Sequence, residues 1–189
     1  MTTHCATQQR RTVMAEMTLI VTGGTLDKDY DALTGQLTLT ETHIHQILAQ
    51  ARLNAPPQVV PLMLKDSLDM TDADRQRLIQ ACRNTQSQRI VITHGTDTLA
   101  DSARACLEAQ KQPPTTTLAH KTIMFTGAMR PWALGQSDTL FNLGAALTAV
   151  QCLPAGVFAC MNGEIFTGDQ VQKNTEKGVF ETKSKSQPK

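Results

Sequence analysis

The stretch that decides the fold is Met17–Thr25, MTLIVTGGT, an apolar run that stops at two glycines. Its first six residues predict a buried β-strand, and Gly23 and Gly24 predict the turn that ends it. Similar runs predict four further strands, at Val59–Leu64, Arg89–Thr93, Thr122–Thr126 and Gly156–Met161. Short, nearly uninterrupted apolar strands are typical of a parallel sheet that is covered on both faces.

Helical patterns separate these strands. The helix expected over Glu41–Leu53 carries four apolar side chains on one face: Ile44, Ile47, Leu48 and Ala51. Thr71 and Asp74 form a capping-box-like start. Further helices are expected from Thr71 to about Asn84, from the turn at 94–97 through Gln110, and over Ser137–Gln151. Because strands and helices alternate, the sequence predicts a single doubly wound α/β domain, flavodoxin- or Rossmann-like, with about five parallel strands and helices on both faces.

We expect this domain to span residues 17–180. Residues 1–16 are interpreted as a disordered leader, and residues 181–189 as a basic, solvated tail. Met14 or Met17 is an equally good start for the chain. The leader has no apolar segment of the kind that directs secretion, so a cytoplasmic location is expected.

Charge and composition argue against several classes of protein. The 189 residues include 18 Lys and Arg against 17 Asp and Glu, which leaves no broad positive surface for nucleic acid or an anionic membrane. No stretch approaches the ~18 apolar residues of a membrane span. The five cysteines include no C-x-x-C pair, and Cys82, Cys106 and Cys160 are expected to be buried. We therefore expect no disulfide framework, no metal, no cofactor, and no nucleic-acid or membrane partner.

Polar turns follow four of the predicted strands, at residues 22–25, 65–69, 93–98 and 126–131. The carboxyl ends of parallel strands share one edge of a sheet, where ligands bind. Each turn also has a structural explanation, because glycine permits positive φ and Thr96, Asp97 or Thr98 could cap a helix. Phosphate binding is disfavoured, since neither G-x-x-x-x-G-K-[ST] nor G-x-G-x-x-G is present.

Nucleophilic catalysis is the second functional interpretation of these turns. A threonine hydroxyl needs a base, and backbone N–H groups of a glycine turn can stabilise the resulting oxyanion. Asp97, beside Thr96, could act with a lysine whose pKa is lowered by partial desolvation. The residues alone leave three lysines open: Lys28, Lys65 and Lys173.

The sequence resembles the L-asparaginases of the bacterial type, in a short form with one domain. The matching stretches, in the family's order, are LIVTGGTLDK (Leu19–Lys28), KDSLDMTD (Lys65–Asp72), VITHGTDTL (Val91–Leu99), FTGAMRP (Phe125–Pro131), DTLFNL (Asp138–Leu143) and VQKNT (Val171–Thr175). The resemblance implies that L-asparagine is hydrolysed to L-aspartate and ammonia, without a cofactor, through an acyl-enzyme on Thr25. It also implies a second catalytic unit made of Thr96, Asp97 and Lys173. The substrate-binding positions that it implies are Ser67, Asp97, Gly24 and Gly95.

Tyr30 is the sole tyrosine, within a stretch, Asp27–Gly35, that is interpreted as a mobile loop. The resemblance implies that Tyr30 helps to activate the first threonine, and simple packing at the surface is the alternative. His94 is expected to make a structural hydrogen bond. Arg130 either approaches a carboxylate or shapes its loop before Pro131, and Trp132 is expected at an interface or lid.

Two departures from the family pattern keep alternatives open. Members usually carry a C-terminal domain that supplies an acidic residue to a neighbouring subunit, and this chain ends roughly where that domain would begin. Leu68 stands where the longer relatives often have Gln. A broader amidase or glutaminase, and an amino-acid-binding module without hydrolysis, therefore remain alternatives. A homo-oligomer, dimer or tetramer, is expected to bury apolar surface.

Overall fold

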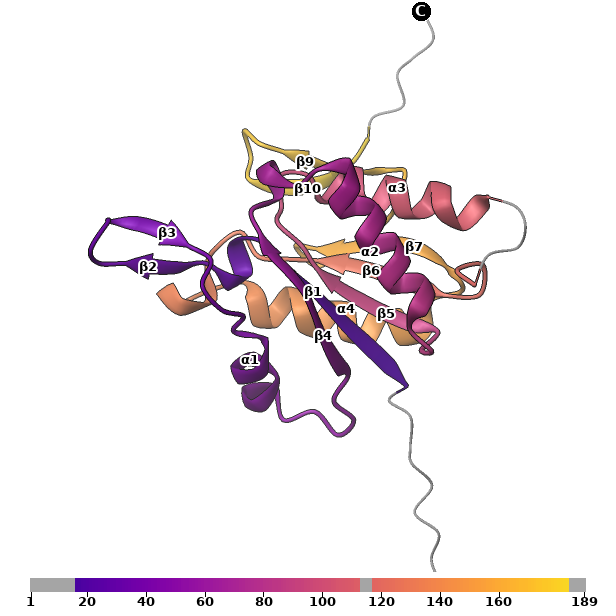
Figure 1. Ribbon diagram of the computed structural model, residues 1–189, viewed down its shortest axis with the longest axis horizontal. Coiled ribbons are helices and arrows are strands. Elements are labelled where there is room, and N and C mark those ends of the chain that lie inside the picture. The colour runs from indigo at the N-terminus through magenta and orange to yellow at the C-terminus, as the bar shows by residue number, and fades with distance from the viewer. Residues whose placement is uncertain (1–15, 113–116, 184–189) are drawn as a thin grey trace, which may run out of the picture.

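The computed structural model describes residues 16–112 and 117–183, and its centre is one six-stranded sheet (Figure 1). The strand order is β4-β1-β5-β6-β7-β8. The strands are β1 (Met17–Gly23), β4 (Gln58–Lys65), β5 (Arg89–Thr93), β6 (Thr122–Thr126), β7 (Gly156–Met161) and β8 (Glu164–Thr167). The first five strands in that order are parallel, and β8 pairs antiparallel with β7. The predicted parallel α/β sheet is confirmed, and β8 extends it by an edge strand that the sequence did not predict.

Four α-helices cover the two faces of this sheet. They are α1 (Ile44–Ala51), α2 (Asp72–Asn84), α3 (Leu99–Lys111) and α4 (Thr139–Cys152). Buried residues of α2 and α3 form one apolar cluster with Ile20, Ile90 and Ile92. Residues of α1 and α4 form a second cluster with Leu19, Val21 and Val91. Because neighbouring residues of a strand point to opposite faces, each strand contributes to both clusters.

Two helices differ in how closely they follow the expectation. In α2, Thr71 accepts from the Asp74 amide, and the Asp74 side chain accepts from the Thr71 amide, so the capping box is confirmed. Helix α1 is shorter than the expected Glu41–Leu53. Its first turn is delayed because the Thr42 hydroxyl and the His43 amide both donate to Oδ1 of Asp27, each at 2.9 Å.

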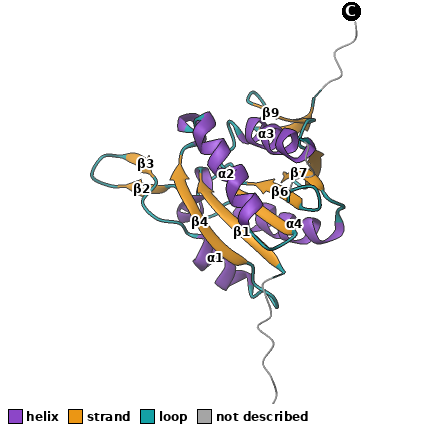
Figure 2. Cartoon of the chain, turned by 45° about the vertical axis from the view of Figure 1, so that its right-hand side comes forward, coloured by secondary structure: helices purple, strands orange, loops and turns teal. Residues whose placement is uncertain are grey.

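The stretch that was expected to be a mobile loop contains a short hairpin, which corrects that interpretation. Strands β2 (Asp29–Asp31) and β3 (Gln36–Thr38) pair antiparallel and project from the sheet (Figures 1 and 2). Asp31 closes the turn, because its carboxylate accepts from the Leu33 amide and the Thr34 hydroxyl. Gly35 follows with a φ of 71°.

A second hairpin lies where the sequence predicted the start of a solvated terminus. Strands β9 (Val171–Asn174) and β10 (Val179–Thr182) pair antiparallel, and Val171 and Phe180 are buried in the cluster of α2 and α3. The expected tail boundary at residue 181 thus falls inside β10, and residues 184–189 lie outside the described residues, as do residues 1–15 of the expected leader. Burial anchors this hairpin, which a run of only four residues does not reveal in the sequence.

Three short 3₁₀ helices complete the described elements: η1 (Thr25–Asp27), η2 (Ser67–Asp69) and η3 (Trp132–Leu134). Cys82, Cys106 and Cys160 are buried free thiols, as expected. Within residues 16–112 and 117–183, no helix is long and apolar enough to cross a membrane.

Candidate functional site

The four polar turns come together because their strands are neighbours. Strands β4, β1, β5 and β6 lie side by side and parallel, so the turns after them share one edge of the sheet. Across this edge, the Gly24 amide donates to the Lys65 carbonyl at 2.9 Å, and the His94 amide donates to the Thr126 carbonyl at 2.9 Å. The edge that carries the predicted site is therefore a hydrogen-bonded floor.

Glycine makes this floor possible at Gly24 and Gly95. Gly24 has a φ of 85°, and a Cβ atom there would lie 2.3 Å from the Gly95 nitrogen. A Cβ atom on Gly95 would lie 2.6 Å from the Ser67 hydroxyl oxygen and 3.0 Å from the Ser67 nitrogen. A side chain at either position would have to displace the neighbouring turn, because backbone atoms cannot give way as the end of a flexible side chain can. The turns that carry Thr25, Ser67 and Thr96 consequently pack in close contact.

Lys173 joins two of the predicted catalytic residues. Its Nζ donates to Oγ1 of Thr96 at 2.8 Å and to Oδ1 of Asp97 at 2.7 Å. Lys173 comes from β9, whereas the other two residues follow β5. Thr96 is buried, and the side chains of Lys173 and Asp97 are 14% and 39% exposed, so the charged side of this cluster faces solvent. The hairpin β9–β10 thus brings a lysine to a threonine and an aspartate that are far away in the sequence.

Thr25 and Tyr30 stand apart from this cluster. Thr25 is half-buried at the start of η1, and among the described residues no hydrogen bond joins its hydroxyl to Lys173 or Thr96. Tyr30 lies on β2 with 55% of its surface exposed, and its backbone amide donates to the Asp29 side chain. The structure does not bring Tyr30 to Thr25.

Ser67 presents a buried hydroxyl that lacks a partner within the described ranges. Its carbonyl accepts from the Thr98 hydroxyl at 2.7 Å, which ties η2 to the start of α3. A buried polar atom without a partner costs free energy, so a ligand oxygen at this point would be stabilising. Its neighbour Leu68 is 72% exposed and adds no polar group.

His94 is a buried structural residue, as the sequence predicts. Its Nδ1 lies 2.8 Å from the Gly95 carbonyl, and its Nε2 lies 2.8 Å from the Ser102 hydroxyl. Burial lowers the pKa of His94 to about 4, so the ring is neutral at pH 7. A neutral ring that donates to the Gly95 carbonyl through Nδ1 accepts from Ser102 through Nε2. His94 thereby fixes the turn that carries Thr96.

Arg130 and Trp132 shape the fourth turn. The Arg130 guanidinium donates to the carbonyls of Gly135 and Leu134, at 2.8 and 3.3 Å. This supports the loop-shaping interpretation. Trp132 packs against the cluster of α1 and α4, and its expected role at an interface or lid stays a prediction.

Two acidic residues near Thr25 were not singled out from the sequence. Asp66 accepts an ion pair from Lys28, with 2.5 Å between Nζ and Oδ2. Asp27 is buried, its desolvation raises its pKa, and its Oδ2 has no partner in the described chain. Sequence distance hid both, because their partners come from other segments. The only signal was a charged residue inside each of two polar turns, LDK and KDS.

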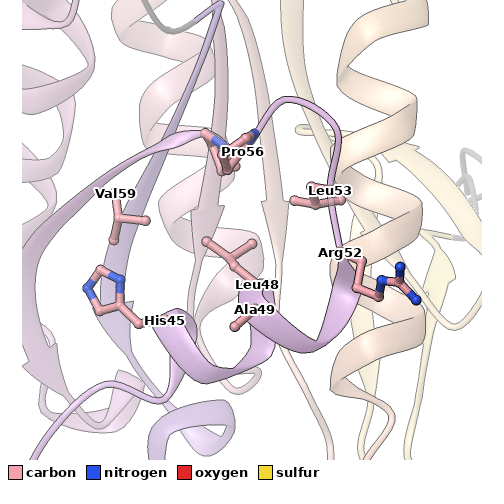
Figure 3. Close-up of a pocket in the computed structure, with 8 residues that line it drawn as sticks. His45, Leu48, Ala49, Arg52, Leu53, Pro56 and Val59 are labelled. Carbon is pink, nitrogen blue, oxygen red and sulfur yellow. The ribbon is translucent and has the colours of Figure 1, made fainter.

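A separate hollow of about 510 Å³ lies between α1 and the start of β4 (Figure 3). It is lined by apolar side chains, including Leu48, Leu53 and Val59, with His45 and Arg52 at its sides. The segment after α1 leads into the beginning of β4, so this hollow lies toward the amino ends of the strands. It contains none of the predicted site residues.

Comparison with known proteins adds a family to this geometry. Residues 16–188 match the family model described as asparaginase, N-terminal. The chain is 30% identical over 182 residues to a glutamyl-tRNA(Gln) amidotransferase polypeptide of Haloquadratum walsbyi, covering 88% of this chain and 39% of that protein. It is 26% identical over 177 residues to a glutaminase-asparaginase of Pseudomonas fluorescens, covering 87% and 47%.

A solved structure is similar in the same region. The thermostable L-asparaginase from Thermococcus kodakarensis superposes with a TM-score of 0.74 and 25% identity, over 88% of this chain and 50% of that one. The chain thus spans half or less of the length of each of these three proteins.

Proposed function

This chain belongs to the asparaginase family, and on that premise we propose that it hydrolyses the side-chain amide of L-asparagine to L-aspartate and ammonia. The observation that carries the proposal is the position of Lys173 between Thr96 and Asp97, at the edge of the sheet where the Thr25 and Ser67 turns meet. A lysine that contacts a buried hydroxyl and a carboxylate can accept, hold and return a proton.

The proposed reaction has two halves. In the first, the Thr25 oxygen attacks the amide carbon, its proton passes to the leaving nitrogen, and ammonia departs from an acyl-enzyme ester. In the second, water attacks the ester, gives one proton back to the Thr25 oxygen and releases aspartate. We assign the proton movements to the unit of Thr96, Asp97 and Lys173.

Substrate binding uses the charges and the unpaired hydroxyl of the site. The Asp97 carboxylate is assigned to the substrate ammonium, and the buried Ser67 hydroxyl to its α-carboxylate. The Gly24 amide is already bound to the Lys65 carbonyl, so Gly24 contributes close packing and Gly95 remains the glycine available as an oxyanion donor.

A broader amide preference is the second candidate function. The exposed Leu68 offers no polar contact to an amino acid, which would otherwise fix the length of the substrate. One relative is named as both glutaminase and asparaginase. Hydrolysis of glutamine or another short amide would use the same residues.

Ammonia release from asparagine, glutamine and D-asparagine tests these functions with purified protein. Thr25→Ala and Lys173→Met should each lower turnover by about a thousandfold or more while the protein stays folded. Thr148→Ala and Lys177→Met make the same chemical changes at exposed positions and should keep full turnover. Near-normal turnover in Thr25→Ala would reject Thr25 as the nucleophile and favour Thr96. Binding of aspartate by calorimetry without any ammonia release would instead identify an amino-acid-binding module.

A further inference from the structure

Lys28 and Asp66 form a second ion pair at the site, beside the one between Lys173 and Asp97. The Lys28 ammonium lies 2.5 Å from Oδ2 of Asp66, and the two side chains are 22% and 27% exposed. Oδ1 of Asp66 accepts from the Leu68 amide at 3.0 Å. Both oxygens of this carboxylate are thus occupied by groups of the chain.

The position of each partner gives the pair its meaning. Lys28 immediately follows η1, whose first residue is Thr25. Asp66 immediately precedes η2, whose first residue is Ser67, and caps it. One ion pair therefore connects the turn of the proposed nucleophile to the turn of the proposed carboxylate site.

Strand pairing alone does not fix these two turns against each other. The register between β1 and β4 shifts between Val21 and Gly23, just before the turns begin. Beyond that irregularity, a backbone hydrogen bond from Gly24 to Lys65 holds η1 near η2. The Lys28–Asp66 pair is a second link, on the far side of Thr25.

Charge favours a link that is closed at neutral pH. Lys28, and to a smaller extent Lys173, hold the pKa of the Asp66 carboxyl below its usual range. An ion pair that is partly open to solvent contributes little to overall stability. Its main effect here is geometric, because small displacements of a reacting group are costly to catalysis.

We propose that Lys28 and Asp66 act as positioning residues, a latch that holds the Thr25 turn against the Ser67 turn during amide hydrolysis. This inference rests on the proposed function. Lys28 is not assigned to proton transfer, because its ammonium is engaged by Asp66. The latch sets where the Thr25 hydroxyl stands relative to an amide whose α-carboxylate is bound at Ser67.

Three variants separate positioning from proton transfer and from simple structural support. Lys28→Met and Asp66→Asn remove the pair, and Lys28→Arg restores a cation that cannot act as a base at neutral pH. Lys177→Met is the matched control, since it removes an exposed lysine from an ion pair with Glu181. We would measure kcat and KM for asparagine, the melting temperature, and hydrogen exchange of the amides of residues 24–28.

The latch predicts a split between these readouts. Lys28→Met and Asp66→Asn should each lower kcat about tenfold or more, with KM within about threefold of the unmodified value. Lys28→Arg should recover most of kcat, and exchange at residues 24–28 should be faster in the first two variants only. Lys177→Met should match the unmodified protein in every measurement.

Other outcomes identify which idea fails. If Lys28→Arg is as slow as Lys28→Met, Lys28 transfers a proton and the latch is wrong. If Lys28→Met keeps normal kcat and normal exchange, the latch is wrong and the proposed function stands. If the unmodified protein releases no ammonia but Lys28→Met speeds exchange at residues 24–28, the proposed function fails and the link between the turns remains.

Discussion

At the scale of single residues, the buried His94 should make stability depend on pH. Burial lowers its folded pKa to about 4, below an unfolded value near 6.5. The unfolded chain therefore binds more protons in that interval, so stability is full above about pH 6.5 and is lost as pH falls through about 4. Between pH 7 and pH 4.5, the unmodified protein should lose roughly 2–3 kcal/mol more than His94→Gln. Urea unfolding of both proteins at the two pH values measures this difference, and equal losses would contradict a neutral buried ring.

At the scale of elements, the hairpin β9–β10 depends on one aromatic side chain. Phe180 is 4% exposed and packs in the cluster of α2 and α3, while its strand partner is Lys173. Phe180→Ala should lower the free energy of unfolding by about 3–5 kcal/mol and reduce ammonia release, because Lys173 loses its support. Phe141→Ala is the matched control on an exposed phenylalanine, and it should cost less than about 1 kcal/mol. Urea unfolding and hydrogen exchange over residues 171–182 test this, and a hairpin that stays protected in Phe180→Ala would count against it.

Elements also differ in how far the sequence could predict them. The parallel strands and α2 were predictable because each has a long apolar run or a capping residue, such as Thr71, that acts locally. The two hairpins were missed, since strands of three or four residues contain too few alternations to stand out. The contact of Lys173 with Thr96 and Asp97 followed from family resemblance, and local pattern left Lys28 and Lys65 equally open. Asp66 could not be paired with Lys28, because only the folded chain brings η1 and η2 together.

At the scale of the whole molecule, the chain should associate with a second copy of itself. Helix α4 carries no charged residue over Thr139–Cys152, and Phe141 on it is 62% exposed, next to the turn at Gly163. An uncharged helix face with an exposed aromatic is typical of a surface that is covered by a partner. We expect a homo-oligomer, dimer or tetramer, by light scattering and sedimentation at micromolar concentrations. Phe141→Asp should shift the protein toward monomer, because a buried unpaired charge opposes association. Leu33→Asp, on the tip of the β2–β3 hairpin, provides the control at a residue that is 97% exposed, and it should leave the assembly intact. A monomer at all of these concentrations for the unmodified chain would contradict the prediction, and an oligomer unaffected by Phe141→Asp would place the interface on another face.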